Sequence, residues 1–419
     1  MPPKNTHNAK PLKHIRESLG FTLEEVAAHC NMPPNHLRDL ETIHDDIDDH
    51  DAALLSDAYG IDVLDALDDR PDALPPTPLR VLLKAQADVL DAGTRFAISE
   101  AVAVSVDTRR IQELLNERED HPSLFKKFRT NTDYSHPDQG MPEKLAAQVR
   151  EQVRLDDDPI PSMVTLVQGL GIQIVVADLA PEIDAVGFAA SQTGGVIVLN
   201  RSGKHAANAF GRRVTLAHEL CHLLFDRTQM RGINKFCAVS RDRRRTTTKA
   251  PSRFEEIERR ARAFALYLLV PIGALDRLWR RTEGHAAHHR ARLVMEQFGI
   301  GYEAARAHLQ NAGLLSLQEE ISLVDTEPPL AWEARDALPI HASSHLDRVP
   351  LNRRGIYLDL VARAWRQGAL TESGARDALR VTRAAWPPVA AYLTAPHSLI
   401  APACTDWESS AARLGLPRP

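Results

Sequence analysis

The sequence predicts an α+β fold that is predominantly helical, with a small mixed β-sheet packed on two helices. Three observations predict it. Apolar residues recur at helical spacing through most of the 419 residues. Two β-type runs, Ile172–Val176 and Gly195–Leu199, lie close together, with Gly187–Ala190 between them. Amphipathic helices are predicted directly after these strands, at 212–225 and 255–269.

The composition indicates a globular protein. Hydrophobic residues make up 43% of the chain, which is too high a share for a disordered protein. No apolar run approaches the ~20 residues of a membrane helix, and no apolar segment follows the basic N-terminus. The cysteines are scattered without paired spacing, which argues against disulfides and against a cysteine zinc site. We therefore expect a soluble, reduced, cytoplasmic protein with no membrane partner.

The first 75 residues predict a separate all-α domain of short helices. One helix ends at Gly20, and the next begins at Thr22 with Glu25 three residues on, which is a capping box. Two further helices are predicted at 33–41 and 51–59. This unit is long enough to fold as a small domain.

Composition and periodicity divide the chain into five parts. They are a helix-turn-helix-like domain at 1–75, a linker and helical connector at 76–142, a central domain at 143–272, a helical extension at 273–325, and a linker with a helical C-terminal region at 326–419. Within them we expect an apolar-striped connecting helix at 79–118, a loop at 119–142 and a second linker or loop at 326–350.

The central feature is the motif His218-Glu219-Leu220-Cys221-His222 on the first amphipathic helix. Residues four apart on a helix lie on the same face, so the two imidazoles can reach one metal ion. Glu219 is rotated by about 100° and therefore stands beside the ion rather than on it. Two histidine ligands with a carboxylate general base are the metallopeptidase arrangement.

A catalytic zinc site needs a third protein ligand and an open position. The second amphipathic helix supplies candidates. Glu258 lies three residues before Ala261, on the apolar stripe that must face the core, so we predict Glu258 as the third ligand. Glu255 is one turn further out on the same face and remains the alternative, whereas Glu256 points away.

The residues resemble the ImmA/IrrE family of metallopeptidases. The resemblance is carried by Phe210–Phe225, Glu258–Pro271, the strand ending Ile197–Asn200, and Phe298–Gly313, which is similar to the helix-turn-helix-like unit that often follows. It covers about 165–315. The sequence departs from the family pattern at two positions. Cys221 stands where the family usually has Gly before the second His, and Arg262 stands where it usually has Asn after Ala261. Neither position is a ligand.

The resemblance implies a metal-dependent endopeptidase with His218, His222 and Glu258 as ligands and Glu219 as general base. It also implies zinc as the cofactor, with manganese as the alternative, and a cytoplasmic location. The implied partner is a protein substrate, a helix-turn-helix transcriptional repressor cleaved in a stress, DNA-damage, phage or mobile-element response. The oligomeric state stays open, with a dimer as one option.

The N-terminal helices resemble an Xre-type helix-turn-helix, with Asn35, His36 and Arg38 as the candidate DNA or partner contacts. The charge of this segment argues against DNA binding, because residues 1–75 contain 6 Lys and Arg but 16 Asp and Glu. A DNA-binding transcriptional regulator, whose metal site senses or is structural, is the alternative function. A protein-contact module is the alternative for this domain.

Other features have a simpler interpretation. We interpret His285, His288 and His289 as a solvated face, Cys221 as a small buried hydrophobe, and the basic loop Arg241–Arg245 as a solvated loop. Trp365 and Trp386 are expected to anchor the C-terminal core. The strand Val196–Leu199 is expected to be an edge strand that could pair with an extended substrate.

Overall fold

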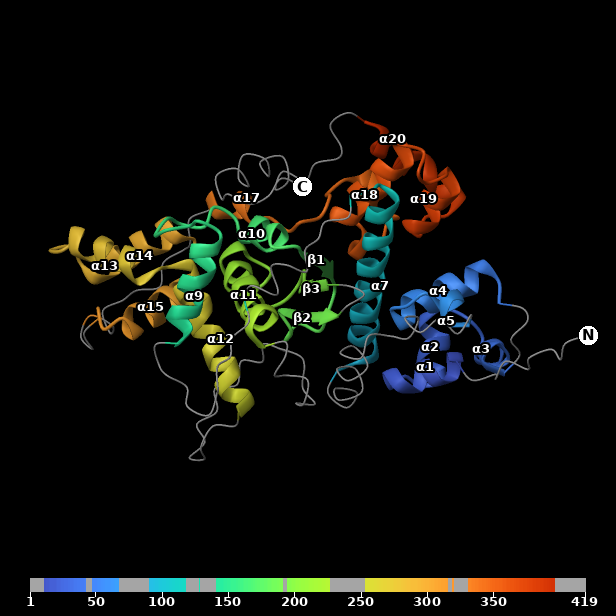
Figure 1. Ribbon diagram of the computed structural model, residues 1–419, viewed down its shortest axis with the longest axis horizontal. Helices are drawn as coiled ribbons and strands as arrows, with labels where there is room; N and C mark the ends of the chain where they lie inside the picture. The colour runs from blue at the N-terminus through green and yellow to red at the C-terminus, as the bar shows by residue number, and fades with distance from the viewer. Residues whose placement is uncertain are drawn as a thin grey trace, which may run out of the picture.

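The computed structural model describes residues 11–42, 47–67, 90–117, 128, 141–190, 194–226, 253–315, 319 and 331–395. Within these ranges the chain is mostly helical with one small mixed sheet, which confirms the predicted fold class. The sheet lies at the centre, with the N-terminal helices on one side and the helices of residues 272–311 on the other (Figure 1). None of the described helices combines the length and the apolar character that a membrane span requires.

The sheet has three strands, β1 (Ile172–Ala177), β2 (Ala185–Ala190) and β3 (Gly194–Asn200), in the order β1-β3-β2. β3 is parallel to β1 and antiparallel to β2. The prediction that Val196–Leu199 is an edge strand is therefore wrong, because β3 is hydrogen-bonded on both sides and has no free edge to offer. In the described part of the chain, no strand pairs with the outer edge of β2.

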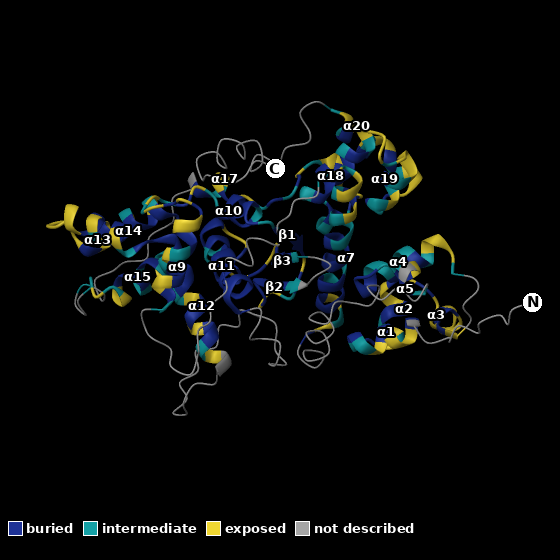
Figure 2. Cartoon of the chain, in the orientation of Figure 1, coloured by how far each residue is buried: buried dark blue, intermediate teal, exposed yellow. Residues whose placement is uncertain are grey.

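Both faces of the sheet are buried, which explains the near-continuous apolar strands. Alternate side chains point to opposite faces. One face joins a core with α7 (Ala92–Leu114) through Val175, Ala177, Val186, Phe188, Val196 and Val198. The other joins a core with α10 (Met163–Gly169) and α11 (Ala209–Cys221) through Ile172, Ile174, Ala185, Ile197 and Leu199. Buried residues accordingly concentrate in the sheet, α10 and α11 (Figure 2).

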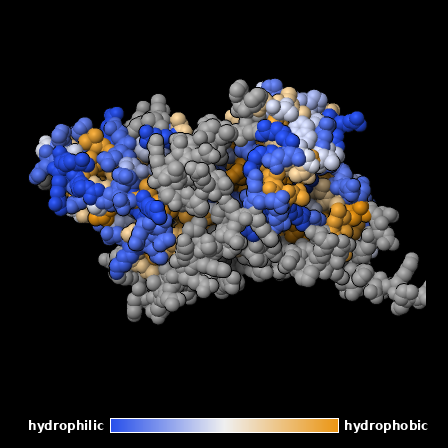
Figure 3. All heavy atoms as spheres, turned by 45° about the horizontal axis from the view of Figure 1, so that its top comes forward, coloured by the Kyte–Doolittle hydropathy of each residue, from blue (hydrophilic) through white to orange (hydrophobic). Residues whose placement is uncertain are grey.

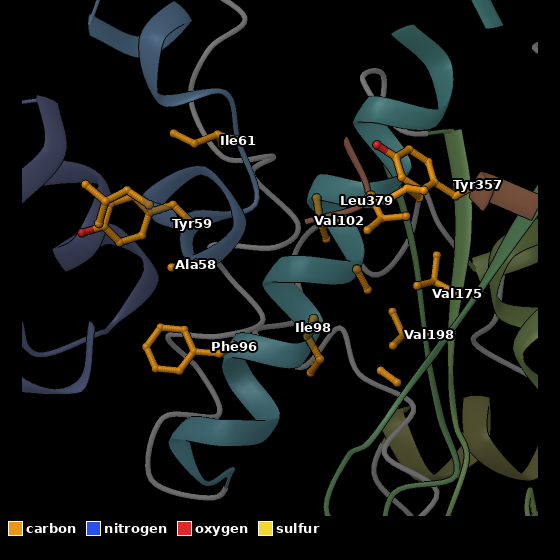
Figure 4. Close-up of a cluster of buried hydrophobic side chains, with 14 of the residues drawn as sticks. Ala58, Tyr59, Ile61, Phe96, Ile98, Val102, Val175, Val198, Tyr357 and Leu379 are labelled. Atoms are coloured by element: carbon orange, nitrogen blue, oxygen red, sulfur yellow. The ribbon is translucent and has the colours of Figure 1, made fainter. Parts of the chain in front are cut away.

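The apolar-striped helix expected at 79–118 is described as α7, and it packs within the hydrophobic core. Its buried residues lie on most of its circumference, because it packs on the sheet on one side and on the N-terminal helices on the other. Phe96 points toward Ala58 and Tyr59, whereas Ile98 points toward Val198 of β3 (Figure 4). One hydrophobic core thus runs from the N-terminal helices through α7 to the sheet.

The N-terminal helices are α1 (Pro11–Leu19), α2 (Leu23–His29), α3 (Pro34–Thr42), α4 (Asp49–Tyr59) and α5 (Val63–Leu67). The capping box at Thr22 and Glu25 is present, and Gly60 ends α4 in the left-handed conformation. Arg95 of α7 donates to the Gly20 carbonyl and to the Glu25 carboxylate. These polar contacts fix the N-terminal helices on α7.

On the other face of the sheet, α12 (Arg253–Leu269) packs against α11 and α9 (Met141–Gln152). The chain continues through α13 (Ile272–Arg281), α14 (Ala287–Phe298) and α15 (Tyr302–Asn311). This end of the molecule presents mostly hydrophilic side chains in Figure 3. The loop expected at 119–142 lies almost entirely outside the described residues.

Residues 331–350, which were expected to lie in a linker, pack against the central domain. Asp336 follows α17 (Ala331–Arg335) and forms a fully buried ion pair with Arg213 of α11. Trp332 of α17 is buried under the same guanidinium, whose carbon lies 4.3 Å from the ring centre. A proline-bearing pattern did not reveal these long-range contacts, because they depend on residues more than a hundred positions away.

The C-terminal region is helical, as predicted. Its elements are η3 (Ser344–Leu346), η4 (Leu351–Arg353), α18 (Ile356–Arg366), α19 (Glu372–Ala378), η5 (Arg383–Ala385) and α20 (Trp386–Thr394). Trp365 and Trp386 stack edge to face with ring centres 5.2 Å apart, as the anchors of this core.

Asp57 of α4 links the N-terminal helices to the C-terminal helical region. It accepts hydrogen bonds from Arg353 at 2.7 Å and from Arg380 at 2.6 Å. Burial alone would raise the pKa of Asp57, but the two guanidinium groups outweigh burial and hold that pKa below its ordinary value. A carboxylate with a lowered pKa stabilises the fold above its unfolded-state pKa of about 3.9, and that stabilisation is lost as the pH falls through the folded-state pKa.

We therefore predict that Asp57→Asn lowers the free energy of unfolding by about 3 kcal/mol at pH 7, because it removes the carboxylate that pairs with the buried Arg353 and the half-buried Arg380. The difference from the wild type should shrink below about pH 4, where the unfolded-state carboxylate takes up a proton, and disappear as the pH falls through the lower folded-state pKa. Urea unfolding at pH 7 and pH 3 measures both effects. The control is Asp178→Asn, which breaks an exposed pair with Arg201 and should cost less than about 1 kcal/mol. Equal losses in the two variants would contradict the assignment.

Candidate metal centre

The site is built on α11 and on the π-helical turn η1 (His222–Asp226) that continues it. The Asn208 side chain caps α11 by accepting from the Gly211 amide. The apolar residues Leu216, Ala217 and Leu220 are buried and hold the helix under the sheet. π-helical turns are rare and occur frequently at functional sites. Here the turn begins at the second histidine of the motif.

His218, His222 and Glu258 converge as the sequence predicted. One ligand atom from each lies within 4.8 Å of the others, and all three side chains are buried. The two imidazole Nε2 atoms are 3.1 Å apart. The Glu258 carboxylate oxygens lie 3.4 Å from His218 Nε2 and 3.3 Å from His222 Nε2. It is the only such group of histidines, cysteines and carboxylates in the part of the chain that is described.

These separations fit a metal ion. Four ligands in a tetrahedron with bonds of ~2.0–2.1 Å lie ~3.3 Å from one another. The two imidazole Nε2 atoms are separated by 3.1 Å, and each lies at a similar distance, 3.4 or 3.3 Å, from a different oxygen of Glu258. Two histidine nitrogens and one carboxylate oxygen are also a common donor set for catalytic metals. The residues present therefore fit the ion that the motif implies.

Glu258 reaches the site because of its position on α12. It stands on the same stripe as Ala261, Phe264 and Ala265, all of which are buried in the core shared with α11. Glu255, the alternative third ligand, is exposed and is not part of the cluster. The interactions with His218 and His222 outweigh burial and lower the pKa of Glu258, so this carboxylate is ionised and available as a ligand.

Glu219 is buried beside the cluster and points at β2. Neither of its carboxylate oxygens has a hydrogen-bond partner of normal geometry among the described residues. Burial raises the pKa of Glu219 to about 8, with a further increase from Glu258 and an opposing effect of His222. A buried carboxyl whose pKa is near neutrality can both accept and return a proton.

β2 approaches this carboxylate at Gly187. A Cβ atom at that position would lie 2.7 Å from Glu219 Oε2, which is closer than a real contact allows. The absence of a side chain at Gly187 therefore creates the space that the Glu219 carboxylate occupies. The sequence analysis placed this glycine near a strand but gave it no role, and only its nearness to the motif in space shows one.

Asp226 and Arg260 also belong to the site and were not predicted. Asp226 Oδ2 lies 2.8 Å from His222 Nδ1, and Arg260 donates to the other Asp226 oxygen. Burial alone would lower the pKa of His222, but its contacts with Asp226 and Glu258 raise it to about 10. For His218 burial dominates, and the pKa is lowered. The sequence does place Asp226 four residues after His222, a spacing that puts two side chains on the same face of a helix and could have indicated the contact.

The candidate contact residues of the N-terminal domain lie on the exposed face of α3, away from the metal centre. His36 Nε2 lies 2.6 Å from Asp51, and Arg38 donates to the Asn35 side chain at 2.6 Å. Their hydrogen-bonding groups are thus partly used within the N-terminal helices, beside the exposed carboxylate of Asp39.

The remaining candidates follow their simpler interpretation where they are described. His285, His288 and His289 are exposed, and Cys221 is buried. Burial raises the pKa of the Cys221 thiol well above its ordinary value, so the thiol stays protonated. The loop Arg241–Arg245 lies outside the described residues.

The fold and the cluster are consistent with a metallopeptidase-type domain. Residues 167–310 match the family model of the IrrE N-terminal-like domain, Peptidase M78. The match runs from the end of α10 through the sheet, α11 and α12 to α15, so this part of the chain is similar to an ImmA/IrrE-type peptidase domain. It does not include the N-terminal helices, whose helix-turn-helix resemblance stays a prediction. Searches of curated proteins and of solved structures gave no match.

We predict that Gly187→Ala keeps the metal and loses peptidase activity, because the new methyl group displaces the Glu219 carboxylate without touching a ligand. Metal content by mass spectrometry and turnover of a cleaved substrate measure the two properties separately. Gly301→Ala is the control, since a Cβ there would meet Phe210 Cβ at an ordinary 3.7 Å. Full activity of Gly187→Ala would show that Glu219 does not need its present position.

Proposed function

We propose that the protein is a zinc-dependent endopeptidase that cleaves a protein substrate. The observation that carries the proposal is the cluster of His218, His222 and Glu258, whose ligand atoms lie within 4.8 Å of one another, beside the buried Glu219 carboxylate, which has no hydrogen-bond partner of normal geometry among the described residues. Two imidazole ligands and one carboxylate favour zinc, and manganese remains the alternative. When bound, the ion supplies Lewis acidity, which polarises a peptide carbonyl and lowers the pKa of the attacking water.

The protein's own residues divide the remaining work. His218, His222 and Glu258 hold the ion. Glu219 takes the proton of the attacking water on its carboxylate and returns it to the leaving amine. Gly187 keeps the strand backbone close to that carboxylate, so both groups can face the same peptide bond.

We further propose that the substrate chain is bound along β2. Its outer edge pairs with no strand in the described residues, and its middle residue, Gly187, lies against Glu219. An extended peptide added at this edge would have its backbone held by main-chain hydrogen bonds and would pass beside the general base. This role replaces the one first expected for β3, which lies in the middle of the sheet.

The resemblance to the ImmA/IrrE family supports a helix-turn-helix transcriptional repressor as substrate, and therefore a role in a stress, DNA-damage, phage or mobile-element response. The N-terminal helices support a role in recognition of that partner rather than of DNA. Their exposed helix α3 carries Arg38 next to Asp39, and the 1–75 segment has a net charge of −10. Few phosphates could be neutralised by such a surface. Cytoplasmic action fits this substrate class.

We predict that Glu219→Gln keeps the metal but lowers the cleavage rate by roughly 10²–10⁴-fold, because the shape is kept and the base is lost. The matched control is Glu255→Gln, an exposed glutamate on α12 that should leave cleavage unchanged. The measurement is mass spectrometry of new protein N-termini in cells that express the wild type, Glu219→Gln or Glu255→Gln.

New termini in a helix-turn-helix protein should accumulate with the wild type and with Glu255→Gln only. If Glu219→Gln produces the same termini at the same rate, the peptidase mechanism is refuted. If Glu219→Gln produces no new termini but the full transcriptional response, cleavage is unnecessary, and the regulator that was the alternative function is favoured.

A further inference from the structure

Asp226 is the last residue of η1 and has no solvent-exposed surface. A buried carboxylate is costly unless both its oxygens are hydrogen-bonded. Here one oxygen lies 2.8 Å from His222 Nδ1, and the other accepts from Arg260 of α12. The carboxylate is therefore held between a ligand histidine and the helix that carries the third ligand, Glu258.

The contact selects one form of the His222 ring. A neutral imidazole carries one N–H and one lone pair, on different nitrogens. An ionised Asp226 can only accept, so in the neutral ring that can bind a metal the proton lies on Nδ1 and the lone pair on Nε2. That nitrogen is the one that faces the cluster, 3.1 Å from His218 Nε2 and 3.3 Å from Glu258 Oε1.

Arg260 connects this contact to the third ligand. Glu258 and Arg260 are two residues apart on α12, and both reach toward the end of α11. Glu258 acts on the cluster directly, whereas Arg260 acts on it through Asp226. A shift of α12 relative to η1 would disturb both contacts together.

We infer that Asp226 is a positioning residue that holds His222 in its metal-binding tautomer, and that Arg260 keeps Asp226 in place. The inference rests on the proposed function only in requiring that the cluster binds zinc. Carboxylate partners of ligand histidines orient the ring and raise its basicity, and their removal typically weakens metal binding by about 10- to 100-fold.

If Asp226 had a purely structural role, its substitution would lower stability without changing zinc affinity. The pair Arg213–Asp336 is also fully buried and also joins α11 to a distant segment, but it contacts no ligand. Asp336→Asn is therefore the matched control. It should lower the melting temperature as Asp226→Asn does, and it should leave zinc affinity unchanged.

The experiment measures zinc affinity of the full chain by competition with a chromophoric chelator. We expect Asp226→Ala to weaken zinc binding about 10- to 100-fold. Asp226→Asn keeps an acceptor for Nδ1–H and should lose less. Arg260→Lys keeps the charge with poorer geometry and should also show an intermediate loss. These two conservative variants decide the question if Asp226→Ala does not fold.

A second readout is specific to the ring. In proton–nitrogen spectra of the zinc-loaded protein, the His222 Nδ1 proton should exchange slowly in the wild type and rapidly in the Asp226 variants. Unchanged zinc affinity and unchanged exchange in those variants would overturn the inference and leave the peptidase proposal intact. Failure of the wild type to bind zinc would overturn both.

Discussion

The structure depends on bringing two imidazoles and one carboxylate, all buried, to within 3.4 Å of one another from two different helices. The buried Glu258 carboxylate needs a positive charge beside it, from a protonated His222 or from a bound cation, since a buried unpaired charge is costly. The packing must therefore hold α11 and α12 in place. The hydrophobic core shared by these helices supplies that constraint.

The sheet places the backbone of one of its strands beside Glu219, the proposed general base. It does so through β2, whose Gly187 lets the strand come close to Glu219. The opposite face of the sheet is covered by α7, to which the N-terminal helices are fixed. A partner that binds the N-terminal helices would therefore be held by the same body that carries the peptidase centre, and the proposed recognition role depends on that continuity.

Local patterns in the sequence were sufficient for most of the helices and strands and for the proximity of His218, His222 and Glu258. The spacing of His218 and His222 and the apolar stripe below Glu258 follow from helix geometry alone. What could not be predicted depends on contacts between distant segments. The central position of β3 follows from the strand order, which local patterns do not contain. The burial of α7 follows from its packing between the sheet and the N-terminal helices. Asp226 and Arg260 became functional candidates only when α12 was seen against η1.

The central claim is that one metal ion is bound by His218, His222 and Glu258. Anomalous diffraction from zinc-loaded crystals, collected on both sides of the zinc absorption edge, tests it most directly. The account predicts one strong peak about 2.0–2.2 Å from the two Nε2 atoms and a Glu258 oxygen, with Glu219 outside bonding distance. No peak at this cluster, or a peak with Glu219 or Asp226 as a ligand in place of Glu258, would contradict it.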